Sequence, residues 1–220
     1  MSLKLFIFDC DGTLVDSQHT IVEGMEHAFG VHRLPAPTAE ETRSIIGLSL
    51  PEAIFKLAPH LTAAQNGALV ESYKDFVIGK RARGEAEEYL YDGARDAIEA
   101  LAKAPDVLLG IATGKAYRGV LHLFDCYGWH DLFVTVQTAD RAPSKPHPGM
   151  ILQAMGETGV AAADTYMIGD TSYDMEMAVS ARVNTIGVSW GYHTSDALMQ
   201  AGAQHIVDDY PELHALLAGL

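Results

Sequence analysis

The sequence predicts an α/β protein: a parallel β-sheet with helices on both faces, into which an all-helical cap domain is inserted. Three observations lead to this prediction. Residues 3–8 form an apolar run with the length of a buried strand, residues 16–88 follow a helical pattern, and strand-like and helical segments alternate after residue 91. Such alternation is typical of a parallel sheet covered on both faces. We therefore expect a core domain of residues 1–15 and 89–220 and a cap domain of residues 16–88.

The predicted cap carries helix signals in three segments. Residues 38–47 begin with Thr38 at an N-cap position, continue with acidic residues and close on a glycine. Residues 50–59 place a proline in the first turn, where its missing N–H costs nothing. Residues 62–82 repeat apolar positions three and four apart. We expect helices in this block and no strand.

The predicted core alternates regularly after the cap. We expect strands and helices in turn because short β-branched runs are separated by longer amphipathic segments and by glycine-rich turns. The expected strands are residues 106–114, 132–138, 164–170, 183–190 and 203–209, and the expected helices are residues 94–104, 115–128, 147–159, 171–182, 195–202 and the C-terminal segment.

Composition limits the classes of partner. The chain has 220 residues, of which 29 are acidic and 15 basic, and its formal charge of −14 repels nucleic acid and anionic membrane surfaces.

Cys10 and Cys126 both lie among apolar residues, which predicts buried reduced thiols, not a disulfide framework or metal cluster. The N-terminus lacks a signal-peptide pattern, and no stretch approaches the about 18 apolar residues of a spanning helix. We expect a cytoplasmic protein with a small-molecule partner.

Polar residues follow four of the predicted strands. In open α/β sheets ligands bind beyond the carboxyl ends of the strands, so these residues are candidates for one site. Each also has a plainer interpretation, as a hairpin turn, a strand-to-helix turn, a solvated lysine or a helix cap. The candidates are Asp9 and Asp11, Thr113 and Gly114 with Lys115, Lys145, and Asp170 with Asp174.

The chemistry of these groups is complementary. Several carboxylates in one small space repel each other, and a hard divalent cation with oxygen ligands, Mg²⁺, resolves that repulsion. Lys145 and the Thr113 hydroxyl suit the oxygens of a phosphoryl group. Asp9 and Asp11 point the same way along an extended backbone, so one can attack phosphorus and the other can transfer protons.

These residues resemble the motifs of the haloacid dehalogenase superfamily, and in particular its phosphatases with a helical cap of the C1 type. The stretch "DCDGTLVDS" is similar to the nucleophile motif, Thr113 in "ATGK" and Lys145 in "SKPHP" stand where the second and third motifs have their polar residues, and "GDTSYD" resembles the acidic fourth motif. Order and spacing match across the whole chain. The resemblance implies a Rossmann-like core and a phosphatase similar to phosphoglycolate phosphatases.

The resemblance also implies a role for each residue. Asp9 is the expected nucleophile and Asp11 the expected acid and base. Mg²⁺ is expected on Asp9, on the backbone carbonyl of Asp11 and on Asp170, with Asp174 bound directly or through water. Relatives that cleave carbon–halogen or carbon–phosphorus bonds lack an acid at the position of Asp11, which disfavours those reactions here.

The stretch "SIIGLSLPEA" resembles the cap loop that reaches the active site in this class. Arg43, Gly47 and Leu48 are therefore candidates for contacts to the leaving group, although a solvated arginine and a helix-ending glycine explain the first two equally well. We expect Mg²⁺-dependent hydrolysis of small phosphate monoesters, with phosphoglycolate or a similar metabolite as substrate. A sugar-phosphate mutase similar to β-phosphoglucomutase is one alternative, and a non-enzymatic receiver-type module that accepts a phosphoryl group is another.

Overall fold

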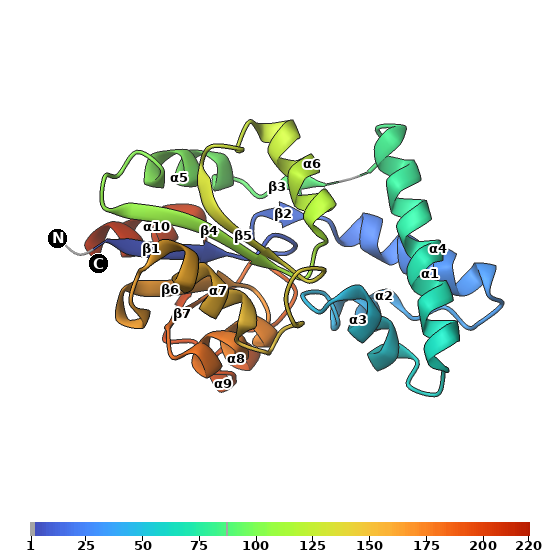
Figure 1. Cartoon of the computed structure of the whole chain (residues 1–220). Coiled ribbons are helices and arrows are strands. Elements are labelled where there is room, and N and C mark those ends of the chain that lie inside the picture. The colour runs from blue at the N-terminus through green and yellow to red at the C-terminus, as the bar shows by residue number, and fades with distance from the viewer. Residues whose placement is uncertain (1–2, 87) are drawn as a thin grey trace.

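The computed structural model describes residues 3–86 and 88–220. Residues 1 and 2, in the predicted core domain, and residue 87, in the predicted cap domain, lie outside the described residues. Six parallel strands form one sheet in the order β5-β4-β1-β6-β7-β8 (Figure 1). The strands are β1 (Lys4–Phe8), β4 (Val107–Thr113), β5 (Phe133–Thr138), β6 (Thr165–Gly169), β7 (Asn184–Val188) and β8 (His205–Val207).

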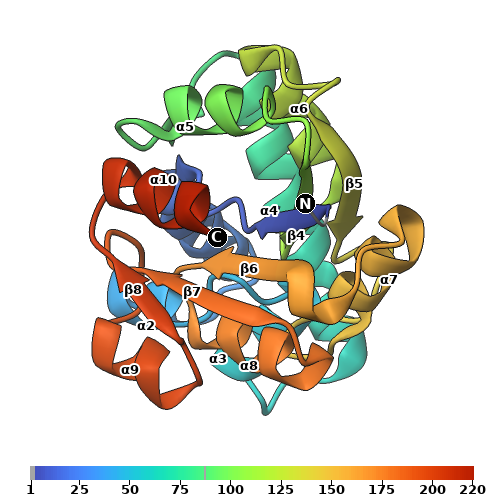
Figure 2. The same cartoon turned by 90° about the vertical axis from the view of Figure 1, so that its left-hand side faces the viewer.

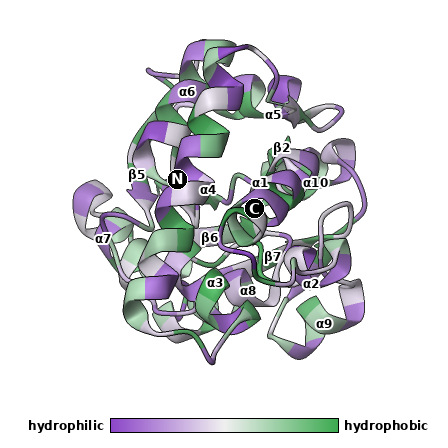
Figure 3. Ribbon diagram, turned by 90° about the vertical axis from the view of Figure 1, so that its right-hand side faces the viewer, coloured by the Kyte–Doolittle hydropathy of each residue, from purple (hydrophilic) through white to green (hydrophobic). Residues whose placement is uncertain are grey.

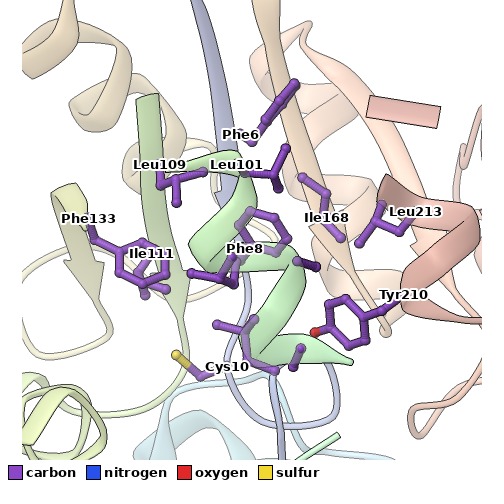
Figure 4. Packing of buried hydrophobic residues seen from close by; sticks show 14 of the residues in the cluster. Phe6, Phe8, Cys10, Leu101, Leu109, Ile111, Phe133, Ile168, Tyr210 and Leu213 are labelled. Carbon is purple, nitrogen blue, oxygen red and sulfur yellow. The ribbon is translucent and has the colours of Figure 1, made fainter. Parts of the chain in front are cut away.

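Helices cover both faces of the sheet (Figure 2), which confirms the predicted fold class. Successive residues of a strand point to opposite faces, and β1 divides its side chains accordingly. Phe6 and Phe8 pack with α5, α6 and α10 (Figure 4), whereas Leu5 and Ile7 pack with α7 and α8. The helices are α5 (Ala94–Leu101), α6 (Tyr117–Tyr127), α7 (Gly149–Thr158), α8 (Ser172–Ala181), α9 (Ser195–Gln200) and α10 (Tyr210–Gly219).

A separate block of helices lies beside one end of the sheet (Figure 1). It has its own hydrophobic cluster, centred on Met25, Ile54 and Leu69, and its surface helices carry both hydrophilic and hydrophobic residues (Figure 3). We call α1–α4 the helical block and propose that it is the predicted cap domain. The helices are α1 (Gln18–Val31), α2 (Ala39–Arg43), α3 (Leu50–Leu57) and α4 (Ala63–Ala82).

Two short strands connect the helical block to the sheet. β2 (Val15–Asp16) and β3 (Tyr89–Leu90) pair antiparallel, with Val15 opposite Leu90 and Asp16 opposite Tyr89. The sequence analysis expected no strand between residues 16 and 88, and that expectation is wrong at Asp16. A two-residue strand is too short to show an alternating pattern, so its pairing depends on the tertiary arrangement.

Two local predictions need correction. Thr38 caps α2 through a capping box with Glu41, as its position predicts, but the helix ends at Arg43 and does not continue to Gly47. Gly47 has a φ of +100°, in the region that favours glycine, and it lies in a turn after the helix. Cys10 is buried, but Cys126 is exposed, because it lies on the outer side of α6 near His122.

Candidate active site

The loop after β1 is folded tightly around one carbonyl group. The Cys10 carbonyl oxygen accepts hydrogen bonds from the N–H groups of Thr13, Leu14 and Val15 at 3.2, 2.8 and 2.9 Å. Gly12 in this loop has a φ of +85°, and a Cβ atom there would lie 2.1 Å from Asp170 Oδ2. The glycine therefore lets the loop backbone approach the carboxylate of a neighbouring strand end.

Three carboxylates meet beyond the ends of β1 and β6. Asp9, Asp170 and Asp174 are fully buried, and one oxygen from each lies within 4.8 Å of the other two. Lys145 Nζ, also buried, lies 2.9 Å from Asp9 Oδ2 and 2.5 Å from Asp174 Oδ1. One lysine against three aspartates leaves an excess of negative charge, so the structure brings these four predicted residues together in a site that favours a cation.

The electrostatics of the cluster follow from burial. Loss of hydration raises the pKa of Asp9 from its ordinary value of 3.8 to about 7, Asp174 and Asp11 add to the rise, and Lys145 opposes it. Burial also raises the pKa of Asp170 well above its ordinary value, with Asp174 and Asp9 as further causes. Asp9 and Asp170 therefore release their protons at a higher pH than exposed aspartates do, and added positive charge would favour their ionised forms.

Hydrogen bonds fix the two aspartates that follow β6. Asp170 accepts from the Thr13 hydroxyl at 2.8 Å and from the Tyr192 N–H at 2.9 Å. Asp174 accepts from the Thr171 N–H at 3.0 Å and from its hydroxyl at 2.7 Å, in the capping box of α8. The plainer interpretation of Asp174 as a helix cap is thus correct, and the same side chain also faces Lys145.

The donor set fits a hard divalent cation. All the candidate ligand atoms are carboxylate oxygens, which Mg²⁺ prefers over nitrogen and sulfur. Among the described residues, Lys145 is the one partner of Asp9 Oδ2, at 2.9 Å. The remaining lone pairs of this buried oxygen can therefore bind a cation.

Asp11 lies in a second network beside the cluster. Its Oδ1 accepts from the Ser17 hydroxyl at 2.5 Å and lies 2.8 Å from Lys115 Nζ. Lys115 Nζ is also 3.0 Å from Glu88, which pairs with Arg81 through two hydrogen bonds of 2.9 and 2.7 Å. The network connects α4 of the helical block to the loop after β4, so it joins the two parts of the molecule at Asp11.

This second network contains two acidic residues, Asp11 and Glu88, and two basic residues, Lys115 and Arg81. Burial lowers the pKa of Lys115, but Asp11 and Glu88 outweigh it and the pKa lies above its ordinary value. Burial raises the pKa of Glu88, but Lys115 and Arg81 outweigh it and the pKa lies well below its ordinary value. The ion pair between Lys115 and Glu88 therefore persists across the neutral pH range.

The remaining predicted residues lie close to these networks, with one exception. Thr113 is buried, and its hydroxyl accepts from the Lys115 N–H at 3.2 Å. A Cβ on Gly114 would lie 2.6 Å from the Gly47 carbonyl oxygen, so the predicted cap loop touches the core there. A cavity of about 470 Å³ adjoins both glycines and Asp11, whereas Arg43 does not line it.

Sequence reasoning missed several residues of the site. Thr13 was visible within the first motif, and Lys115 stands at the end of "ATGK", yet neither was assigned a contact to a specific aspartate. Ser17 also stands within the first motif, but its hydrogen bond to Asp11 was not predicted. Glu88 and Tyr192 gave no signal, because they reach the site through contacts with residues distant in sequence.

Comparisons with known proteins agree with this geometry. The model of the family described as haloacid dehalogenase-like hydrolase matches residues 6–188. "Probable phosphatase IndB" of Dickeya dadantii is 37% identical, with 97% of this chain and 94% of that protein covered. A "Phosphoglycolate phosphatase" of Photobacterium profundum is 27% identical, with 96% and 94% covered. The crystal structure of a predicted phosphatase from Clostridium acetobutylicum has a TM-score of 0.88 at 24% identity over 100% of both chains, which shows a shared fold.

None of the helices in the described part of the chain combines the length and apolar character that crossing a membrane requires.

Proposed function

The chain belongs to the family of haloacid dehalogenase-like hydrolases, and from that membership we propose that it is a Mg²⁺-dependent phosphatase that hydrolyses small phosphate monoesters through an aspartyl-phosphate intermediate. One observation supports the proposal most strongly. Asp9 lies 2.9 Å from Lys145 Nζ in a buried cluster with Asp170 and Asp174. A nucleophile, a phosphate-binding cation and a metal-ligand set are thereby available in one place.

In the first half of the reaction an Asp9 oxygen attacks phosphorus, and the bond between phosphorus and the ester oxygen breaks. Asp11, protonated at this stage, donates its proton to the departing alkoxide. Asp11 lines the cavity, so a leaving group held there meets its carboxyl group. Lys145 and the Thr113 hydroxyl contact the phosphoryl oxygens.

In the second half, water attacks the phosphorus atom of the aspartyl-phosphate. The Asp11 carboxylate takes a proton from that water, inorganic phosphate leaves, and the Asp9 carboxylate is restored. Asp9, the backbone carbonyl of Asp11, Asp170 and Asp174 would hold Mg²⁺. When bound, the cation offsets the negative charge of the carboxylates and of the phosphoryl oxygens.

The receiver-type module and the sugar-phosphate mutase, the two alternatives to a phosphatase, are not equally supported. Membership of a hydrolase family leaves the receiver-type module without support. A sugar-phosphate mutase has the same aspartyl-phosphate chemistry and is separated from a phosphatase only by its products. Phosphoglycolate is named for relatives at 26–28% identity, so it is a first substrate to test. The cytoplasmic location and the absence of a nucleic-acid or membrane partner remain predictions.

The proposal is tested by phosphate release from a panel of esters, including phosphoglycolate, p-nitrophenyl phosphate and glucose 1-phosphate, with Mg²⁺ or with a chelator. We expect turnover only with Mg²⁺. Isomerisation of the sugar phosphate that requires a bisphosphate primer, without net phosphate release, would instead identify a mutase.

Asp9→Asn provides the residue-specific test, with Asp131→Asn, an exposed aspartate before β5, as its matched control. We expect the first variant to lose turnover and the second to retain it. Full turnover by Asp9→Asn would exclude Asp9 as the nucleophile.

A further inference from the structure

The cavity beside Asp11 extends from the core into the helical block. Its volume is about 470 Å³. Asp11, Gly114 and Lys115 form its core side, and α1, α4 and the segment between α2 and α3 form the opposite side. A molecule whose ester oxygen meets Asp11 therefore has its organic part within the helical block.

The walls on that opposite side are mainly aliphatic. Ile21 and Met25 come from α1, Val70 and Val77 from α4, and Ile45 from the segment after α2. Met25, Ile45, Val70 and Val77 are each less than 9% exposed, so they form a fixed surface. Tyr73 adds an aromatic ring from α4. Binding of an apolar group against such a surface is favourable, whereas binding of a charged group there is unfavourable because the charge loses its hydration.

Most of the basic residues that line the cavity already form ion pairs with acidic residues. Lys115 lies between Asp11 and Glu88, Arg81 forms a two-bond pair with Glu88, and Lys74 pairs with Glu71 at 2.8 Å. Among the lining cations of the described chain, only Arg118 forms no ion pair, and it is exposed at the surface. The aliphatic walls thus offer no unpaired positive charge to a second anionic group, and the unpaired Arg118 is exposed to water.

The volume indicates the size of the occupant. A cavity of about 150 Å³ with aliphatic walls holds one benzene ring, and this cavity is about three times larger. We propose that the preferred substrate is a phosphate monoester of an uncharged, bulky apolar alcohol, with a body of about two fused rings. This inference rests on the proposed phosphatase function and specifies its leaving group.

The inference separates this chain from enzymes whose substrates carry a second anionic group besides the phosphate. The carboxylate of phosphoglycolate would have to lie near Asp11, where the lining cations Lys115 and Arg81 are already paired with acidic residues. Burying a charge without a partner is costly, so phosphoglycolate should be a poor substrate although relatives carry its name.

Two esters test this preference directly. 2-Naphthylmethyl phosphate and phosphoglycolate are both esters of alkyl alcohols, which limits the difference in their intrinsic reactivity, and methyl phosphate serves as a minimal reference. We expect kcat/KM for the naphthylmethyl ester to exceed that for phosphoglycolate at least about 10-fold, since a single methylene in an apolar pocket changes it by about 10–200-fold. An equal or larger value for phosphoglycolate would overturn the inference and leave the phosphatase function intact.

Val77→Phe tests the position of the leaving group, because the larger side chain reduces the cavity from α4. We expect the ratio of kcat/KM for naphthylmethyl phosphate to that for methyl phosphate to fall at least about 10-fold. Val179→Phe, at a valine that is 51% exposed on α8, is the matched control and should leave the ratio unchanged. Because the measure is a ratio within one variant, partial loss of folded protein does not affect it. An unchanged ratio in Val77→Phe would contradict the inference.

Binding of 2-naphthylmethanol tests the cavity without any chemistry. We expect saturable binding by titration calorimetry, with a negative heat-capacity change from apolar burial, weakened at least about 10-fold by Val77→Phe and unaffected by Val179→Phe. If the alcohol binds but no ester is hydrolysed, the proposed function fails and the cavity assignment stands. If esters are hydrolysed but the alcohol does not bind, the cavity assignment fails alone.

Discussion

Replacing Asp9 by asparagine should stabilise the metal-free protein while it abolishes turnover. Asp9 is fully buried beside Asp170 and Asp174, and Lys145 is the one cation that contacts the cluster among the described residues. The fold therefore favours the protonated carboxyl group, which asparagine resembles in shape and charge. The proposed mechanism requires the carboxylate, so the demands of stability and of turnover conflict at this residue.

The magnitude follows from the pKa of Asp9, which is raised from 3.8 to about 7. A folded-state pKa above the unfolded value means that ionisation destabilises the fold. The cost is absent below the unfolded pKa, grows as pH rises, and is complete above the folded pKa. At about 1.4 kcal/mol per pKa unit, it amounts to about 2 kcal/mol at pH 5 and about 4 kcal/mol at pH 8. Asp9→Asn should recover these amounts.

Denaturant unfolding in the presence of a chelator, at pH 5 and at pH 8, measures the free energy of unfolding of wild type and variant. Asp131→Asn controls for the loss of an exposed carboxylate. The gain from Asp9→Asn should be larger at pH 8 than at pH 5, and the control should show no such trend. A variant that is less stable than wild type at pH 8 would refute the account of the cluster as an electrostatic liability.

Three further predictions concern the surroundings of the cluster. Lys145→Met should reduce stability by about 3–5 kcal/mol at pH 8 by leaving buried carboxylates unpaired, measured by denaturant unfolding; unchanged stability would contradict the burial of the pair. Gly114→Ala should raise KM and lower the free energy of unfolding by about 1–3 kcal/mol, because its Cβ would lie 2.6 Å from the Gly47 carbonyl oxygen. Steady-state kinetics measure the first effect and denaturant unfolding measures the second. With methyl phosphate as substrate, Glu88→Gln should lower kcat/KM about 10-fold and leave KM nearly constant. An unaltered kcat would show that the network does not position Asp11.

The fold was predictable because its signals are local and repeated. Apolar runs such as residues 3–8 and 164–170 recur between amphipathic segments, and parallel strands end at the same edge of the sheet. That rule alone brings Asp9 and Asp170 together although 160 positions separate them. The same rule made Lys145 a candidate, since it follows the strand of residues 132–138, but its contacts with Asp9 and Asp174 depend on the path of the loop that precedes α7.

The parts that could not be predicted depend on contacts between the helical block and the core. The link from Arg81 through Glu88 to Lys115 joins α4 to two loop residues, and none of the three has a sequence pattern that specifies its partner. The pairing of β2 with β3 involves two residues on each side, fewer than an alternating pattern requires. Cys126 has apolar neighbours in sequence, but the 3.6-residue period of α6 turns it toward solvent.

The paired strands β2 and β3 mean that the chain leaves the sheet and returns to it at a single point. A different set of helices could be grafted between Asp16 and Tyr89 if its two ends matched the spacing of one strand pair. The carboxylate cluster on the sheet would stay intact in such a chimera, while the aliphatic walls around the alcohol would be exchanged. Descendants of one ancestral hydrolase could thus diversify in substrate without altering the residues that break the phosphate ester.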